Sequence, residues 1–185
     1  MTNGRKASLL ALAGFGLATA GAAWYGARYS RGSRDGWYRN LRKPSFTPPD
    51  NIFPVAWTTL YALIAYSGWR VWSAAPSRNR DHALRLWVSQ LAANAEWSKL
   101  FFRDRSPVLA LADIFALEGS VVGYIAASHK VDRGAAYAFV PYAAWVAFAT
   151  VLNAEIVRLN PEVLETGSGG GTLGILADFL RVIRR

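Results

Sequence analysis

Residues 37–61 read WYRNLRKPSFTPPDNIFPVAWTTLY, a stretch that begins in a polar, basic segment and ends in an apolar one. Its proline-rich part, residues 41–54, is named the proline strap. Each proline fixes its own backbone φ and pushes the residue before it toward an extended conformation. The sequence therefore predicts a stiff connection with aromatic residues at both ends: Trp37, Trp57 and Tyr61. The prolines are Pro44, Pro48, Pro49 and Pro54.

The composition on either side of this stretch is that of a membrane protein. Of the 185 residues, 52% are apolar and 18% are charged, and 8 are tryptophan. Soluble domains carry more charge, nearer a quarter of their residues. The net charge is +9, but the arginines cluster between long apolar blocks. Membrane topology and lipid headgroups explain that placement better than nucleic acid, which we do not expect as a partner.

Five apolar segments are long enough to cross a bilayer. The first runs from residue 7 to 29, and the others are placed at 51–72, 82–102, 107–128 and 134–159. Ala20-Gly21-Ala22 leaves open a secretory signal peptide, but the first run is nearer a spanning length, so a retained helix is favoured. Backbone groups in lipid must be bonded within the segment, so the segments should be helices, and their length disfavours a β-barrel.

These segments predict an all-α, polytopic membrane protein with a five-transmembrane-helix bundle in residues 1–160. Residues 161–185 read as a Gly/Ser linker and a short basic amphipathic tail, which either lies on an anionic leaflet or frays. With five spans, eight of the 21 Lys and Arg residues lie on one side of the membrane. The other 13 lie on the side that also holds the first loop and the C-terminus. The positive-inside rule then places the first loop and the C-terminus in the cytoplasm.

Two of the predicted helices carry aromatic and amide side chains on one face. Residues spaced by about one or two helical turns share a face. A pocket between two such faces would suit a large, flat, mostly apolar ligand. Plain helix packing, with the amides bridging helices, is the alternative. The two sets are Gln90, Asn94, Trp97 and Phe101 on the third helix, and Tyr142, Trp145, Ala149 and Asn153 on the fifth.

Charged residues inside the predicted spans are costly in lipid and so are candidates for function. Glu96 and Lys99 lie three residues apart, which predicts a structural ion pair. Asp113 and Glu118 could cap a broken backbone group, face a dimer seam or line the pocket. Glu155 lies near a helix end and can reach water. No acid and base roles follow from the sequence.

The two histidines, His82 and His129, lie in predicted connections. A bis-histidine haem site would need them inside facing helices, so haem ligation by either is not expected. The chain has no cysteine, which excludes a disulfide or a thiolate-bound metal. No metal site is predicted, and no nucleotide-binding loop or hydrolase nucleophile motif is present.

Several motifs in chain order give residues 37–160 a resemblance to the TspO/MBR family of tryptophan-rich sensory proteins and translocator proteins. They match the first loop and three of the five helices of that family. The motifs are Trp37-Tyr38, Leu41, Lys43-Pro44, Pro48-Pro49, Phe53-Pro54, Trp57-Thr58 and Leu60-Tyr61; Asn94, Trp97-Ser98 and Leu100-Phe101-Phe102; and Pro141-Tyr142, Trp145, Phe148-Ala149 and Leu152-Asn153.

The resemblance implies a membrane protein, often a homodimer, that binds porphyrin or haem as a ligand in a pocket opening toward the first loop. It implies a sensory, scavenging or transport role without a required cofactor. Sterols and isoquinoline-type compounds are further implied ligands. The pocket positions of the family correspond to Tyr38, Tyr61, Asn94, Trp97 and Ala149 in this sequence.

The resemblance leaves two alternatives to simple binding. One is an enzyme that degrades porphyrin in a light- and oxygen-dependent way, with Trp37, Trp57 and Trp145 as the residues that carry it. The other is an oligomeric membrane scaffold modulated by ligands. A sterol-recognition motif of animal members is absent, because Ala154-Glu155 follows Leu152-Asn153, and Leu109 replaces a tryptophan of some animal members. The Ala- and Arg-rich composition favours a protein of a bacterial envelope membrane.

Overall fold

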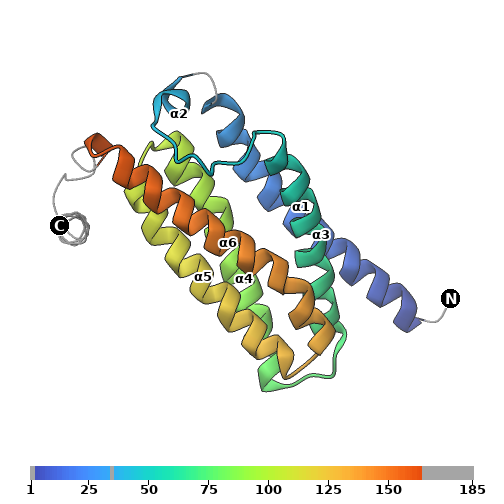
Figure 1. Cartoon of the computed structure of the whole chain (residues 1–185). Coiled ribbons are helices and arrows are strands. Elements are labelled where there is room, and N and C mark those ends of the chain that lie inside the picture. The colour runs from blue at the N-terminus through green and yellow to red at the C-terminus, as the bar shows by residue number, and fades with distance from the viewer. Residues whose placement is uncertain (1–2, 34–35, 164–185) are drawn as a thin grey trace.

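A computed structural model describes residues 3–33 and 36–163 of the chain, and within these residues it is a bundle of helices without strands (Figure 1). Five long helices and two short ones follow one another along the chain. This confirms the predicted all-α, five-helix bundle. The elements are α1 (Asn3–Ser33), α2 (Trp37–Asn40), α3 (Ile52–Ser73), α4 (Arg78–Ser98), the π-helix η1 (Lys99–Arg103), α5 (Pro107–His129) and α6 (Arg133–Leu159).

The long helices close into a ring in the order α1, α3, α6, α5, α4 (Figure 1). Among the described residues, three stretches are long and apolar enough to cross a membrane: Gly4–Ser30, Pro107–His129 and Arg133–Leu159. The N-terminal part of α1 projects beyond the bundle (Figure 1). Leu10 and Leu17 of this helix are 73% and 74% exposed. Exposed leucines on an apolar spanning helix are suited to contact with lipid tails.

Glycine brings three of the helices together at Gly68 of α3. A Cβ atom at this position would lie 2.6 Å from Nε1 of Trp87 and 2.7 Å from Cδ1 of Phe15. Trp87 donates a hydrogen bond from Nε1 to the Ile64 carbonyl oxygen at 2.9 Å, and the Phe15 ring meets the Trp87 ring edge-on at 4.8 Å. The close packing of α1, α3 and α4 therefore requires a residue without a side chain here.

Both ends of α4 differ from the sequence prediction. α4 begins at Arg78 rather than residue 82, because Ser77 accepts a hydrogen bond from the Arg80 amide at 3.2 Å and caps a polar first turn that hydropathy does not reveal. The α-helical part of that segment ends at Ser98, and η1 replaces the rest of it. The following turn holds Arg105 at φ 51°.

One further difference concerns the first connection. The first loop contains α2, a single helical turn that the sequence analysis did not predict. The predicted tail falls mostly outside the described residues, which end at Val163.

At the end of the bundle remote from α2, Asp132 joins α3 to α6. Its Oδ1 accepts a hydrogen bond from the Ala135 amide at 2.8 Å and so caps α6. Its Oδ2 accepts from Nε and Nη2 of Arg70 at 2.9 and 2.7 Å. Partial burial alone would raise the pKa of Asp132, but the Ala135 amide and the Arg70 guanidinium outweigh it and the pKa is lowered.

We expect Asp132→Asn to lower the free energy of unfolding at pH 7 by about 0.5–1 kcal/mol, because asparagine can keep the helix cap but loses the charged pair with Arg70. The pKa of an aspartate in an unfolded chain is about 3.9. At pH values above this, a carboxylate whose pKa is lowered by folding stabilises the folded state, and this stabilisation is lost as the pH falls through the pKa of the folded state. Denaturation in detergent at pH 7 and under acid conditions should show the wild type and the variant converging at low pH. An equal gap at both pH values would contradict this role.

Candidate functional site

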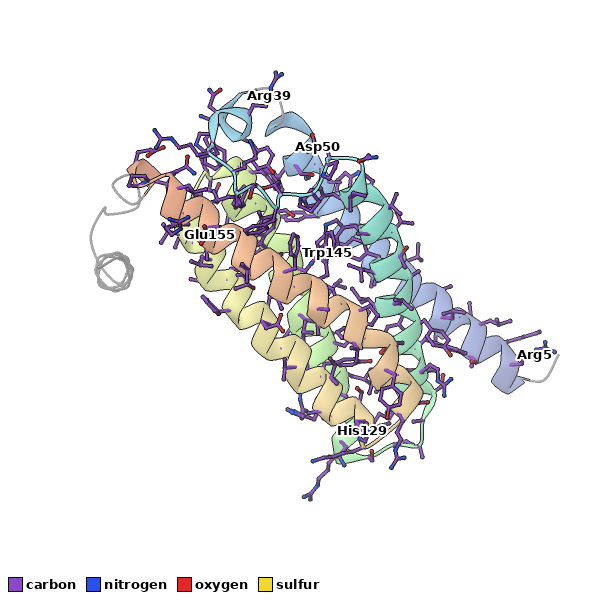
Figure 2. All side chains as sticks on the ribbon, viewed as in Figure 1. Arg5, Arg39, Asp50, His129, Trp145 and Glu155 are labelled. Carbon is purple, nitrogen blue, oxygen red and sulfur yellow. The ribbon has the colours of Figure 1, made fainter. Side chains whose placement is uncertain are left out.

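A cavity of about 560 Å³ lies inside the ring of helices, at the end where α2 and the proline strap cross the bundle. Every long helix contributes to its lining. Figure 2 shows Trp145 directed into the interior between α6 and α3, with Asp50 and Arg39 at the end where the proline strap lies. His129 lies at the opposite end of the molecule (Figure 2).

One wall of the cavity is built from aromatic residues of α3 and α6. The Trp57 ring stacks on Tyr61, one turn further along α3, with centroids 5.2 Å apart and planes at 29°. Trp145 meets Trp57 edge-on at 6.3 Å and Phe53 at 5.9 Å. These edge-on contacts fix the indole rings relative to one another, because the positive edge of one ring faces the negative face of another.

The facing wall comes from α4 and η1. The Trp97 ring stacks on Phe101 at 5.0 Å with planes at 21°, and Phe102 meets Phe101 edge-on at 5.0 Å. Phe101 and Phe102 are neighbours in sequence, yet both line the cavity. They lie within the π-helix η1, a type of helical turn that recurs at functional sites.

The amide side chains near the cavity are largely occupied by other protein groups. Asn94 Oδ1 accepts from the Tyr61 hydroxyl at 2.7 Å, and Asn94 Nδ2 donates to the Tyr142 hydroxyl at 3.0 Å. The Asn153 amide, oriented to match its neighbours, donates to the Pro107 carbonyl at 3.2 Å and accepts from the Leu111 amide at 3.0 Å. A ligand in this cavity would therefore be held mainly by stacking and apolar contact.

Eight of the ten residues predicted from the sequence line the cavity. The other two, Trp37 and Tyr142, form a layer behind it. Trp37 packs edge-on against Phe101 at 5.9 Å, and Tyr142 is fully buried with its ring 6.2 Å from Trp57. That these residues bind a ligand stays a prediction. The eight lining residues are Tyr38, Trp57, Tyr61, Asn94, Trp97, Trp145, Ala149 and Asn153.

The sequence analysis missed the contributions of α1 and α5 to the lining. The α1 residues recur at helical spacing on one face, but small side chains at this spacing are equally typical of close helix packing. The α5 residues, Ile114 and Leu117, carry no distinguishing feature. Asp50, at the start of α3, is a lining residue that was also missed. The α1 residues are Ala23, Gly26, Ala27 and Ser30.

The charged residues of the spans lie away from the cavity lining. Lys99 Nζ pairs with Glu96, as predicted, and lies 3.8 Å from Asp104 Oδ2. Glu155 pairs with Arg158 at the surface at 2.8 Å. Asp113 and Glu118 each keep one buried carboxylate oxygen without a hydrogen-bond partner among the described residues. None of these five acidic residues lines the cavity.

The proline strap is fastened to the end of α6 beside the cavity mouth. Asn160, 1% exposed, accepts from the Arg42 amide at 2.9 Å and donates from Nδ2 to the Arg42 carbonyl at 2.9 Å. Lys43 Nζ lies 4.4 Å from the centroid of the Tyr38 ring, and burial lowers the pKa of Lys43. The mouth thus combines a cation, the carboxyl group of Asp50 and an aromatic ring.

Comparison with known proteins gives consistent matches over most of the chain. The model of the TspO/MBR family matches residues 14–159. A translocator protein of Bos taurus is 36% identical over 149 residues, which cover 80% of this chain and 88% of that protein. A tryptophan-rich sensory protein of Cereibacter sphaeroides is 39% identical over 126 residues, or 68% and 78% of the two chains. Protein CrtK of Rhodobacter capsulatus is 38% identical over 156 residues, or 83% and 95%.

Proposed function

Because the chain belongs to the TspO/MBR family, we propose that this integral membrane protein binds a tetrapyrrole, a porphyrin or haem, in the cavity between its helices. The observation that carries the proposal is the pair of facing aromatic walls, Trp57 with Trp145 on one side and Trp97 with Phe101 on the other. The names of the relatives, translocator and sensory protein, support a role in transport or sensing.

The shape and chemistry of the cavity support a large aromatic ligand. Its volume of about 560 Å³ lies in the range typical of small-molecule sites. A tetrapyrrole is flat, rigid and mostly apolar, so it can stack on indole and phenyl rings at little cost in conformational entropy. The amides of Asn94 and Asn153 are already bonded within the protein, which favours stacking over polar recognition. Sterols and isoquinoline-type compounds share this flat apolar character.

The proposal extends to the orientation in the membrane. The cavity mouth lies at the end that carries the first loop, and the sequence places 13 of the 21 Lys and Arg residues on that side. The positive-inside rule supports a mouth that faces the cytoplasm, in a bacterial envelope membrane.

Photochemical degradation of the ligand has less support than binding. Of the three tryptophans implied for that reaction, Trp57 and Trp145 line the cavity and contact each other at 6.3 Å. Trp37 does not line it and packs edge-on against Phe101, which does. The arrangement therefore supports a binding site more directly than an oxidative centre that uses all three rings.

Titration with protoporphyrin IX, followed by quenching of tryptophan fluorescence, tests binding. We expect Trp57→Ala to weaken binding about tenfold, because the variant loses one stacking surface and the support of the Trp145 ring. Trp72→Ala is the matched control, since it removes a tryptophan from the opposite end of the same helix, outside the cavity lining. If fluorescence quenching of Trp57→Ala saturates at the same porphyrin concentration as that of the wild type, the ligand does not bind at Trp57 and the proposed site is wrong.

A further inference from the structure

Arg28 of α1 and Arg103 of η1 both lie near the ring of Tyr29, on the outer surface where α1 and η1 pack together. This line of contact between α1 and η1 is called the seam. The guanidinium carbon of Arg28 lies 5.4 Å from the centroid of the Tyr29 ring, and that of Arg103 lies 5.7 Å from the same centroid. Arg28 also lies 5.2 Å from the Trp24 ring. Both guanidinium groups therefore lie within cation–π distance of the same ring.

No acidic residue in the described part of the chain forms a salt bridge with either arginine. The nearest acidic side chains along η1 and α4 are engaged elsewhere, because Glu96 and Asp104 both face Lys99. Like charges brought together without a counterion repel each other, and an anion between them would remove that cost. The seam therefore has the charge arrangement of an anion site.

The position along α1 indicates which anion is available. The apolar stretch of α1 that can cross the membrane ends at Ser30, so Arg28 lies at its end. Trp24, one turn before Arg28, is 64% exposed on the outside of the bundle. Exposed tryptophans and arginines at the end of a spanning helix lie at the level of the lipid headgroups.

We propose that Arg28 and Arg103 form a binding site for the phosphate of an anionic phospholipid, with Trp24 against the upper part of its acyl chains. Arg103 donates one hydrogen bond to the Tyr29 hydroxyl, and the remaining N–H groups of the two guanidiniums match the oxygens of a phosphate. The opposite face of the same seam lines the cavity through Ala27 and Ser30 of α1 and Phe102 of η1. A lipid bridging the two arginines would thus hold together one wall of the cavity.

Native mass spectrometry of the full-length protein in detergent tests this site with three probes: phosphatidylglycerol, phosphatidylcholine and inorganic phosphate. The wild type should retain phosphatidylglycerol in preference to phosphatidylcholine. The double variant Arg28→Gln/Arg103→Gln should retain at least fivefold less phosphatidylglycerol. The control Arg78→Gln/Arg133→Gln, which removes the same charge from exposed positions at the other end of the bundle, should behave as the wild type.

Equal retention by the double variant and the control would overturn the proposal. Displacement of phosphatidylglycerol by millimolar inorganic phosphate would assign the site to a free anion and overturn the lipid assignment. If the glutamine variant does not fold, Arg28→Lys/Arg103→Lys replaces it. Lysine keeps the charge but not the planar fork, so retention should fall about two- to threefold; unchanged or fully lost retention in the lysine variant would contradict recognition by the paired guanidiniums.

Discussion

Replacement of Ala149 by phenylalanine should reduce protoporphyrin affinity by at least a hundredfold while the bundle stays folded. Ala149 lies one turn after Trp145 on α6, and its small side chain is part of the cavity lining. A benzyl group at this position would project into the space between the two aromatic walls. A planar macrocycle cannot share that space with another ring, so the loss should greatly exceed that from removing a single contact.

The variant need not destabilise the protein. Overpacking is costly where side chains already fill a core, whereas a ring that enters a cavity gains apolar contact. We therefore expect the melting temperature of Ala149→Phe in detergent to equal or exceed that of the wild type. A fall in both affinity and melting temperature would point to a distorted bundle rather than to a filled site.

Val151→Phe is the matched control for Ala149→Phe. Val151 lies two residues further along α6 and is 55% exposed on the outside of the bundle. The same ring added there should leave porphyrin affinity within about twofold of the wild type, as expected for a surface position away from any special feature. Wild-type affinity in Ala149→Phe itself would show that the ligand does not enter this cavity.

The five helices could be predicted because a bilayer leaves few alternatives for long apolar segments. The inward faces of α4 and α6 could also be predicted, since Asn94 with Trp97 and Trp145 with Ala149 repeat at helical spacing. Tyr142 shares this spacing yet lies behind the cavity, because Asn94 bonds its hydroxyl and Trp57 covers its ring. Periodicity identifies the face of a helix but not the depth of each residue behind that face.

The rest of the site depends on contacts between distant parts of the chain. Ala23 and Ala27 of α1 look like ordinary small packing residues, and only the neighbouring helices make them part of a cavity wall. The change from α4 to η1 at Lys99 likewise leaves no clear signal in hydropathy. In the sequence Asn160 marks only the end of the last apolar segment, because its partner Arg42 is 118 residues away.

Asn160→Ala should both destabilise the protein and speed the release of bound porphyrin. The substitution leaves the amide and the carbonyl of Arg42 without their partner, and an unsatisfied buried polar group costs about 1–3 kcal/mol. We expect a loss of about 2–4 kcal/mol in the free energy of unfolding, because Asn160 Nδ2 also bonds the Ile156 carbonyl at 2.7 Å. Denaturation in detergent measures this loss.

The kinetic effect follows from what the proline strap connects. Tyr38 precedes the strap, and Asp50 and Phe53 lie in its last residues; all three line the cavity at its mouth. Release of Arg42 from Asn160 frees the strap from α6, so the mouth should open more often and the dissociation rate of protoporphyrin should rise about tenfold, equivalent to ~1.4 kcal/mol in the barrier to release. Stopped-flow displacement by excess unlabelled ligand measures that rate.

Thr47→Val separates fastening of the strap from its internal structure. Thr47 Oγ1 donates to the Pro44 carbonyl at 2.7 Å, a hydrogen bond contained within the strap, and valine keeps the side-chain shape. This variant should leave the dissociation rate near that of the wild type, because the Asn160–Arg42 hydrogen bonds remain. If Asn160→Ala lowers stability but releases porphyrin at the wild-type rate, the strap is not a barrier to release. If both variants release it equally fast, rigidity within the strap, rather than its attachment to α6, controls the mouth.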